Sequence, residues 1–211
     1  MTHEELAARL ARLRIVPVVA IDDAAHALPL ADALIAGGLP VIEVTFRTAA
    51  AAEVIATIAR ERPEMLVGAG TVLSAQQAKA AKEAGARFAV APGVNPRVVA
   101  AARDIGLPFC PGVATPTDIE TALSLDCRTL KFFPAETLGG VKALAAMAAP
   151  YRHVGLNFIP TGGVSAGNLR DYLAGPDVLA VGGTWLAKSE DIAAGKFAEI
   201  QQRCKNAIGK V

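Results

Sequence analysis

Eight short apolar runs recur along this chain of 211 residues, and they constrain its fold more than any other feature. The runs are apolar almost throughout rather than alternating with polar residues, which indicates strands that are covered on both faces, as in parallel sheets. Alanine-rich segments of helical character, such as residues 49–61, 75–84 and 98–105, lie between them. The expected strands are Ile15–Ala20, Val41–Thr45, Leu66–Ala69, Phe88–Ala91, Pro108–Cys110, Thr129–Phe133, Asn157–Thr161 and Val178–Gly182.

Eight strand–helix units in a chain of this length predict an α/β protein with one domain over residues 1–211, a single (β/α)8 TIM barrel. Leu6, Leu10 and Leu13 recur at helical spacing before the first strand, so we expect an additional N-terminal helix. A doubly wound open sheet is the rival architecture. It would favour a glycine-rich dinucleotide loop after the first strand, and the segment Ala20–Asp23 (Ala-Ile-Asp-Asp) is not such a loop.

Charge and hydropathy exclude several classes of partner. The chain has 21 basic and 20 acidic residues, a formal net charge of +1, so no broad attraction to nucleic acid or to an anionic membrane is expected. No stretch approaches the roughly 20 apolar residues of a membrane span, and the acidic N-terminus does not resemble a signal peptide. We therefore expect a cytoplasmic protein. The three cysteines, Cys110, Cys127 and Cys204, are expected to be reduced thiols in or near the core.

Lys131 is the most informative single residue. Barrels of this type take their reactive groups from the carboxyl-terminal ends of the strands, and Lys131 is the one lysine of eight that lies within an expected apolar strand. Burying an ammonium group is costly, so this lysine either pairs with an acid such as Glu43 or loses its proton more easily. A neutral amine is a good nucleophile toward a ketone. Imine chemistry and a purely structural ion pair are both compatible with the position.

Polar residues near two other strand ends extend the candidate site. Alternation along the second strand places Glu43, Thr45 and Arg47 on the same side, which we assign to the barrel interior. Glu43 is suited to general acid/base catalysis, or to the role of a buried counter-ion. The planar fork of Arg47, with the hydroxyls of Thr71 and Thr161, could hold the acid group of a keto acid. An arginine after a strand is also a common surface residue, so both readings of Arg47 stay open.

Two glycine pairs follow the expected seventh and eighth strands. Gly162-Gly163 and Gly182-Gly183-Thr184 stand where barrels of this kind frequently bind phosphate. Backbone N–H groups exposed by glycine, next to a helix N-terminus, suit an anion. One such pair can simply mark a tight turn, but two pairs after adjacent strands predict a phosphate site.

No metal or other cofactor is expected. The histidines, His3, His26 and His153, lie in the N-terminal segment, near the first helix and in a loop. None of them stands at the carboxyl end of a strand beside a carboxylate, which disfavours a divalent-metal site built on histidine.

Four motifs, in order along almost the whole chain, resemble those of the 2-keto-3-deoxy-6-phosphogluconate (KDPG) and 4-hydroxy-2-oxoglutarate (KHG) aldolase family. They are Glu43–Arg47 (Glu-Val-Thr-Phe-Arg), Gly68–Leu73 (Gly-Ala-Gly-Thr-Val-Leu), Lys131–Glu136 (Lys-Phe-Phe-Pro-Ala-Glu) and Pro160–Gly163 (Pro-Thr-Gly-Gly). The resemblance implies a class I aldolase that cleaves KDPG to pyruvate and glyceraldehyde 3-phosphate in the Entner–Doudoroff pathway. It also implies activity on KHG, giving pyruvate and glyoxylate, and a homotrimer that needs no metal.

The resemblance assigns a role to each candidate residue. Lys131 would form the Schiff base and Glu43 would shuttle protons. The substrate carboxylate would bind Arg47, Thr71 and Thr161, the phosphate would bind Gly162, Gly163, Gly183 and Thr184, and the pocket would be lined by Pro92 and Phe133.

The chain departs from the family pattern at Thr184, where a serine is expected, although the hydroxyl is retained. Thr161 favours the gluconate over the galactonate epimer of the substrate, because the related 6-phosphogalactonate aldolases tend to have valine at this position. Two other classes stay open. A sugar-phosphate isomerase or epimerase would use the same glycine turns without an imine, and a non-catalytic binder of phosphorylated acids would leave Lys131 and Glu43 without a role.

Overall fold

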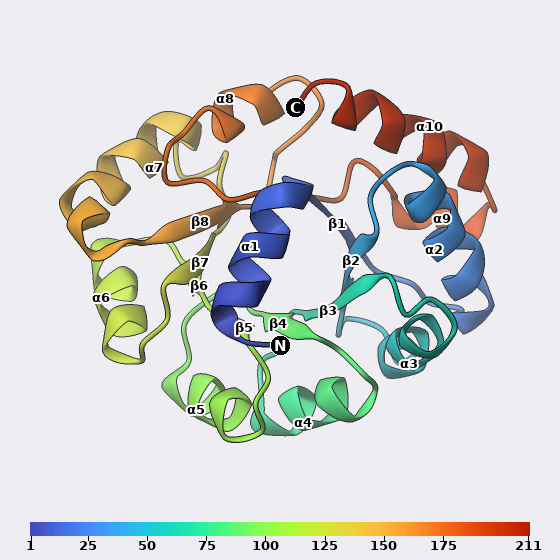
Figure 1. The fold of residues 1–211 in the computed structure, drawn as a ribbon, viewed down its shortest axis with the longest axis horizontal. Coiled ribbons are helices and arrows are strands. Elements are labelled where there is room, and N and C mark those ends of the chain that lie inside the picture. The colour runs from blue at the N-terminus through green and yellow to red at the C-terminus, as the bar shows by residue number, and fades with distance from the viewer.

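Strands and helices alternate from end to end in the computed structural model, which describes all residues from Met1 to Val211 (Figure 1). The strands are β1 (Ile15–Val19), β2 (Val41–Thr45), β3 (Leu66–Gly70), β4 (Phe88–Val90), β5 (Phe109–Cys110), β6 (Gly112–Val113), β7 (Thr129–Phe132), β8 (Asn157–Pro160) and β9 (Val181–Gly183). The helices are α1 (His3–Leu13), α2 (Ala27–Ala36), α3 (Ala51–Glu61), α4 (Ala75–Glu83), α5 (Pro96–Asp104), α6 (Pro116–Ser124), α7 (Gly140–Ala148), α8 (Leu169–Leu173), α9 (Ser189–Ala193) and α10 (Phe197–Ile208), with short 3-10 helices at Ala24–His26 and Ala149–Val154.

The strands pair in parallel and form a curled sheet with helices on its outside (Figure 1). Six strands follow the order β5-β4-β3-β2-β1-β9, and three more the order β6-β7-β8. Only Pro111 separates β5 from β6, and a proline has no N–H for the ladder. Isolated parallel bridges join Phe158 to Val178 and Thr161 to Gly182, beside β8 and β9. The fold is therefore α/β with a curled parallel sheet.

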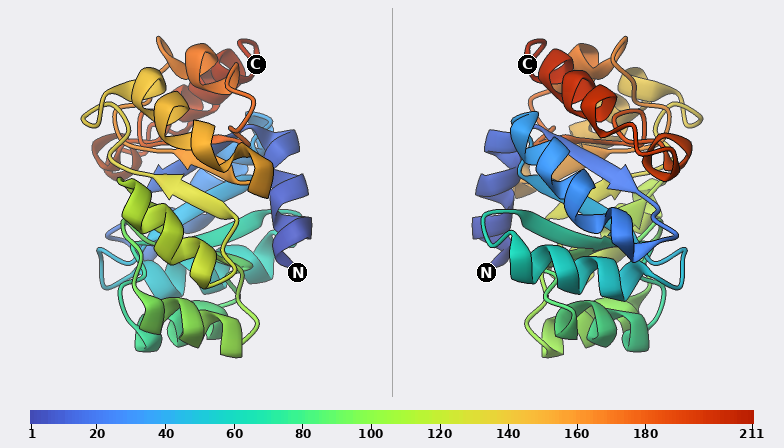
Figure 2. Two further views of the ribbon diagram at one scale, coloured as in Figure 1. Left: turned by 90° about the vertical axis from the view of Figure 1, so that its left-hand side faces the viewer. Right: turned by 90° about the vertical axis from the view of Figure 1, so that its right-hand side faces the viewer.

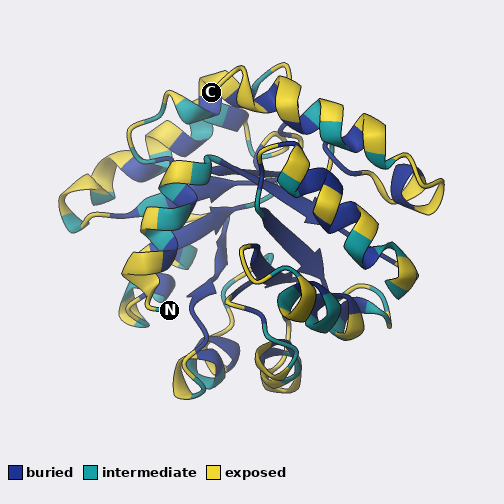
Figure 3. Ribbon diagram, turned by 45° about the vertical axis from the view of Figure 1, so that its right-hand side comes forward, coloured by how far each residue is buried: buried dark blue, intermediate teal, exposed yellow.

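Side chains of each strand point alternately to two apolar layers. In β2, Val41 belongs to an inner cluster, whereas Ile42 and Val44 belong to the larger cluster between strands and helices. Glu43 and Thr45 occupy the remaining positions on the inner side, and both are buried. Figure 3 shows the strands buried throughout and the outer helices exposed on the side away from them. Because both faces of each strand are covered, most of the runs are apolar at every position.

Helix α1 lies across one end of the curled sheet rather than beside the outer helices (Figures 1 and 2). A capping box starts it, in which the Thr2 hydroxyl accepts from the Glu5 N–H and the Glu5 carboxylate accepts from the Thr2 N–H. Its buried leucines, Leu6 and Leu10, pack into the inner cluster. The strand residues of that cluster include Val16, Val41, Leu66 and Phe88, all near the beginning of their strands. The helix thus fills the amino-terminal end and leaves the carboxyl-terminal end open.

The cysteines are free and buried, as expected from the sequence. Burial raises the pKa of Cys127 and of Cys204 to about 11, and it raises the pKa of Cys110 as well. All three therefore remain protonated thiols at neutral pH. Separately, none of the helices has both the length and the apolar character needed to cross a membrane.

Tight packing of the inner layer predicts that even a very small substitution there will lower the free energy of unfolding. A Cβ atom at Gly68 in β3 would lie 2.1 Å from the ring of Phe88, which is fully enclosed. Gly68→Ala should lower the free energy of unfolding by about 1 to 3 kcal/mol, because the ring cannot move aside without disturbing its neighbours. Gly93→Ala is the matched control, since a Cβ there meets nothing within 4 Å. Urea denaturation of both variants tests this, and equal stability would contradict tight packing of the inner layer.

Candidate active site

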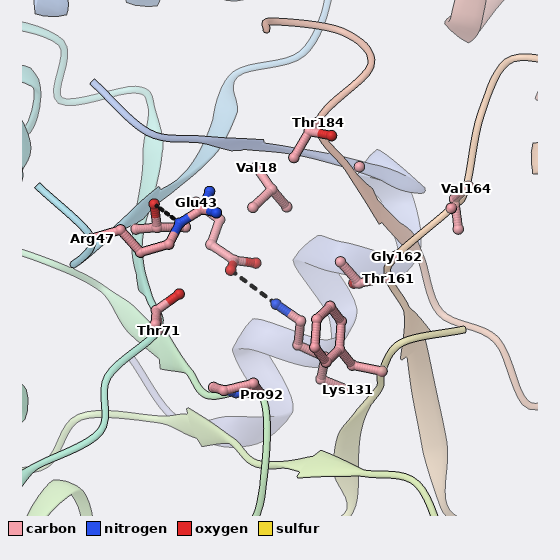
Figure 4. Close-up of a pocket in the computed structure, with 14 residues that line it drawn as sticks. Val18, Glu43, Arg47, Thr71, Pro92, Lys131, Thr161, Gly162, Val164 and Thr184 are labelled. Atoms are coloured by element: carbon pink, nitrogen blue, oxygen red, sulfur yellow. Dashed lines mark hydrogen bonds and ion pairs between the residues drawn. The ribbon is translucent and has the colours of Figure 1, made fainter. Parts of the chain in front are cut away.

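A pocket of about 130 Å³ opens at the carboxyl-terminal end of the strands, opposite α1 (Figure 4). Each of the eleven site residues predicted from the sequence lines it. These are Glu43, Arg47, Thr71, Pro92, Lys131, Phe133, Thr161, Gly162, Gly163, Gly183 and Thr184. Three further residues, Val18, Thr45 and Val164, complete the wall. Residues from positions 18 to 184 thus meet in one place, as expected when the carboxyl ends of parallel strands face the same way.

The centre of the pocket is an ion pair between β2 and β7. Nζ of Lys131 lies 3.1 Å from Oε1 of Glu43, and their side chains are only 7% and 4% exposed. The ammonium also lies 5.5 Å from the ring centroid of Phe133, within the range of a cation–π contact. Figure 4 shows the two side chains pointing toward each other across the pocket. The pairing expected for a buried lysine is therefore present, and the amine faces the pocket rather than the core.

Strand β3 makes room for the carboxylate. A Cβ at Gly70 would lie 2.3 Å from Oε1 of Glu43, so any larger residue would displace the acid from its partner. The motif Gly68-Ala-Gly70 has glycine at both positions that face inward, one below Phe88 and one behind Glu43. No role in packing was predicted for these two glycines. The signal was available in the sequence: the two glycines alternate with Ala69, and glycine within a strand can indicate that another group, here Phe88 or Glu43, approaches the backbone closely.

Thr45 orients Arg47 at the rim of the pocket. The buried Thr45 hydroxyl donates to the carbonyl of Val19 at 2.8 Å and accepts from Nε of Arg47 at 3.0 Å. The terminal nitrogens of Arg47 make no hydrogen bond or ion pair with the protein, so the open edge of the guanidinium is available for an anion. Thr45 was placed on the inner side by its alternation with Glu43, but its role in holding the arginine was not predicted.

The two threonines assigned to the carboxylate lie on different sides of the central pair. Figure 4 shows Thr71 on the side of Arg47, and Thr161 beside Gly162 on the other side. Thr71 has a left-handed backbone with φ of 56°, and its hydroxyl makes no hydrogen bond within the protein. Thr161 donates weakly to the carbonyl of Ile159 at 3.3 Å. Both hydroxyls can therefore turn toward a ligand.

The glycine turn after β8 has backbone N–H groups without an acceptor in the protein. Gly162 and Gly163 line the pocket and have φ of 95° and 83°, a left-handed backbone that glycine adopts readily. These N–H groups and that of Thr184 donate to no acceptor in the protein. The carbonyl of Gly162 accepts from the Glu136 N–H at 3.0 Å, and Nδ2 of Asn168 donates to the carbonyl of Gly163 at 3.2 Å. These two hydrogen bonds therefore fix the backbone of the turn.

The expected helix N-terminus is not directly behind this turn. Helix α8 begins only at Leu169, because Ser165 and Asn168 form a local turn in which the Asn168 side chain accepts from the Ser165 N–H at 2.7 Å. The donors belong to the turn itself. Elsewhere in the protein, no group of three or more His, Cys, Asp or Glu side chains is arranged to hold a metal ion.

An amine buried against a single carboxylate, in a pocket with a free guanidinium edge and unpaired backbone N–H groups, is suited to imine chemistry on an anionic carbonyl compound. Comparison with known proteins agrees. The chain belongs to the KDPG and KHG aldolase family, whose sequence model matches residues 6–203. It is therefore an aldolase, a carbon–carbon lyase. A 2-dehydro-3-deoxy-phosphogluconate aldolase of Treponema pallidum is 50% identical over 191 residues, which cover 90% of each chain.

Solved structures of aldolases have the same fold. A KDPG aldolase of Legionella pneumophila, with pyruvate captured at low pH as a covalent carbinolamine intermediate, has a TM-score of 0.90 and 36% identity, covering 94% of this chain and 96% of its own. The 2-keto-3-deoxy-6-phosphogluconate aldolase of Zymomonas mobilis ZM4 with 3-phosphoglycerate has a TM-score of 0.86 and 41% identity, covering 95% of this chain and 94% of its own.

The backbone of Thr71 predicts a gain of stability on substitution. A β-branched residue with positive φ is strained, at a cost of about 1 to 3 kcal/mol. Thr71→Asn should therefore raise the free energy of unfolding by about 1 kcal/mol, because asparagine tolerates this conformation better. Thr71→Val keeps the branched side chain and should give no such gain. Urea denaturation of the two variants decides this; a destabilised asparagine variant would show that Thr71 carries no strain.

Proposed function

We propose that this chain is a class I aldolase that cleaves KDPG into pyruvate and glyceraldehyde 3-phosphate through a Schiff base on Lys131. The observation that carries the proposal is the Lys131 amine, which is buried within an apolar strand yet faces an acid inside the pocket. Glu43, at 3.1 Å, can take the ammonium proton and leave a neutral nucleophile. The covalent carbinolamine of pyruvate in the Legionella relative supports this chemistry.

The reaction requires no group beyond this pair. The neutral amine attacks C2 of the keto acid, and protonated Glu43 gives its proton to the carbinolamine hydroxyl, which leaves as water. The resulting iminium accepts the electrons of the C3–C4 bond when Glu43, directly or through water, removes the proton of the C4 hydroxyl. Glyceraldehyde 3-phosphate departs, and Glu43 returns the proton to C3 of the enamine. Hydrolysis then releases pyruvate and restores the amine.

The groups proposed for the two ends of the substrate surround the central pair, with Arg47 and Thr71 on one side and Thr161 beside the glycine turn on the other. We assign the carboxylate to Arg47, Thr71 and Thr161 and the phosphate to Gly162, Gly163, Gly183 and Thr184, with Pro92 and Phe133 as apolar walls. The free guanidinium edge and the unpaired N–H groups support these assignments. The 3-phosphoglycerate in the Zymomonas relative is a phosphorylated acid of similar kind.

We further propose that residues 1–211 form one domain, a closed (β/α)8 barrel with α1 as an additional helix. The short gap at Pro111 and the bridges beside β8 and β9 support closure. The family also includes KHG aldolases. We propose KHG as a second substrate, because the Arg47 side of the pocket can bind the keto-acid end of a substrate that has no phosphate group. Thr161 favours KDPG over its galactonate epimer. A cytoplasmic place in the Entner–Doudoroff pathway follows from this substrate.

Borohydride trapping tests the proposed chemistry directly. Incubation with pyruvate and reduction should attach one pyruvate-derived group, and peptide mapping should place it on Lys131. Lys131→Met should lose both the adduct and KDPG cleavage, the latter by at least about 10³-fold. The matched control is Lys142→Met on the exposed face of α7, which should retain both. An unmodified protein after trapping would favour an isomerase or a binding protein, and cleavage by the methionine variant would exclude the imine mechanism.

We also propose a homotrimer, as the family resemblance implies. Light scattering after gel filtration should then give three times the chain mass of 21.7 kDa. A mass of one or two chains across a tenfold range of concentration would refute the trimer without affecting the proposed chemistry, because Lys131 and Glu43 pair within one chain.

A further inference from the structure

Glu136 carries a negative charge next to the glycine turn without lining the pocket. Its N–H donates to the carbonyl of Gly162, and a Cβ at Gly163 would lie 2.5 Å from both Cβ and Cγ of Glu136. The residue therefore packs directly against the turn, within one side-chain length of its N–H groups. It is exposed to solvent, so its carboxylate has room to rotate. A carboxylate in this place opposes the binding of an anion unless it is held elsewhere.

Tyr172 holds this carboxylate. Its hydroxyl donates to Oε1 of Glu136 at 2.5 Å, and the two oxygens lie over Gly140, where a Cβ would be 3.2 Å from Oε1 and 3.6 Å from the tyrosine oxygen. The ring of Tyr172 is fully buried in the core, so the donor is fixed in position. Burial, together with the bond to Glu136, raises the pKa of Tyr172, which therefore remains a neutral donor. Gly140 begins α7, and the positive end of a helix also favours a carboxylate.

We propose that Tyr172 is a positioning residue for phosphate recognition, which holds the Glu136 carboxylate away from the anion donors of Gly162 and Gly163. The inference rests on the phosphate assignment proposed above. Specificity for the phosphate would then depend on a contact outside the pocket, in which the buried Tyr172 hydroxyl on α8 fixes the position of the Glu136 carboxylate in the loop after β7. Neither side chain touches the substrate.

Tyr172→Phe isolates the effect, because it removes the hydroxyl and keeps the packed ring. The KM for KDPG and the inhibition constant of inorganic phosphate should each rise by about 5- to 10-fold, the effect of one like charge released a few ångströms from an anion near the surface. The kcat for KDPG and both constants for unphosphorylated KHG should change by less than twofold. The double variant Tyr172→Phe/Glu136→Gln should recover the wild-type KM for KDPG, since the released side chain is then neutral.

Three outcomes overturn the inference. They are an unchanged KM for KDPG in Tyr172→Phe, an equal rise of KM for KDPG and KHG, and a double variant that is no better than the single one. The last two would show that Tyr172 has only a structural role. Failure of the proposed function is distinguishable, because the wild-type protein would then cleave neither substrate and form no adduct with pyruvate.

Discussion

The ion pair of Lys131 and Glu43 is the constraint to which the rest of the structure conforms. Two charges inside an apolar ring of strands are tolerated only with close pairing and satisfied hydrogen bonds. The protein supplies both: the pair is 3.1 Å apart, and no buried side-chain nitrogen or oxygen lacks a hydrogen-bond partner. Space for the acid comes from the absence of a side chain at Gly70. Below the pair, the leucines of α1 exclude water from the opposite end. The central charges are therefore open to a ligand from one direction only.

Recognition in this protein is local. A chain with a net charge of +1 exerts no long-range pull on an acidic molecule, so affinity has to come from groups placed at the pocket itself. Arg47, held through Nε, and the unpaired N–H groups of the glycine turn lie on opposite sides of the central pair. An extended molecule with an anionic group at each end would span the pocket and bring its middle to the amine.

Much of the site was predictable because it follows from local rules. Alternation along β2 placed Glu43 and Thr45 inward, and the rarity of a charge in an apolar strand identified Lys131. What sequence reasoning missed depends on contacts between distant residues. Tyr172 and Glu136 are 36 positions apart, and neither forms a motif with the other. The fifth expected strand ended at Cys110, whereas the structure has a further short strand, β6, after Pro111. The start of α8 at Leu169 likewise depends on a local turn, in which the Asn168 side chain accepts from the Ser165 N–H.

The position of α1 has a consequence for biosynthesis. Leu6 and Leu10 leave the ribosome long before Ile159 and Ala180, which belong to the same inner cluster. Strand β1 likewise pairs with β9, with Ile15 opposite Val181. The inner layer therefore cannot be completed until Ala180 and Val181 have been made. During translation, the amphipathic first helix remains without its final partners, at the stage when a chain is most exposed to aggregation and to chaperones.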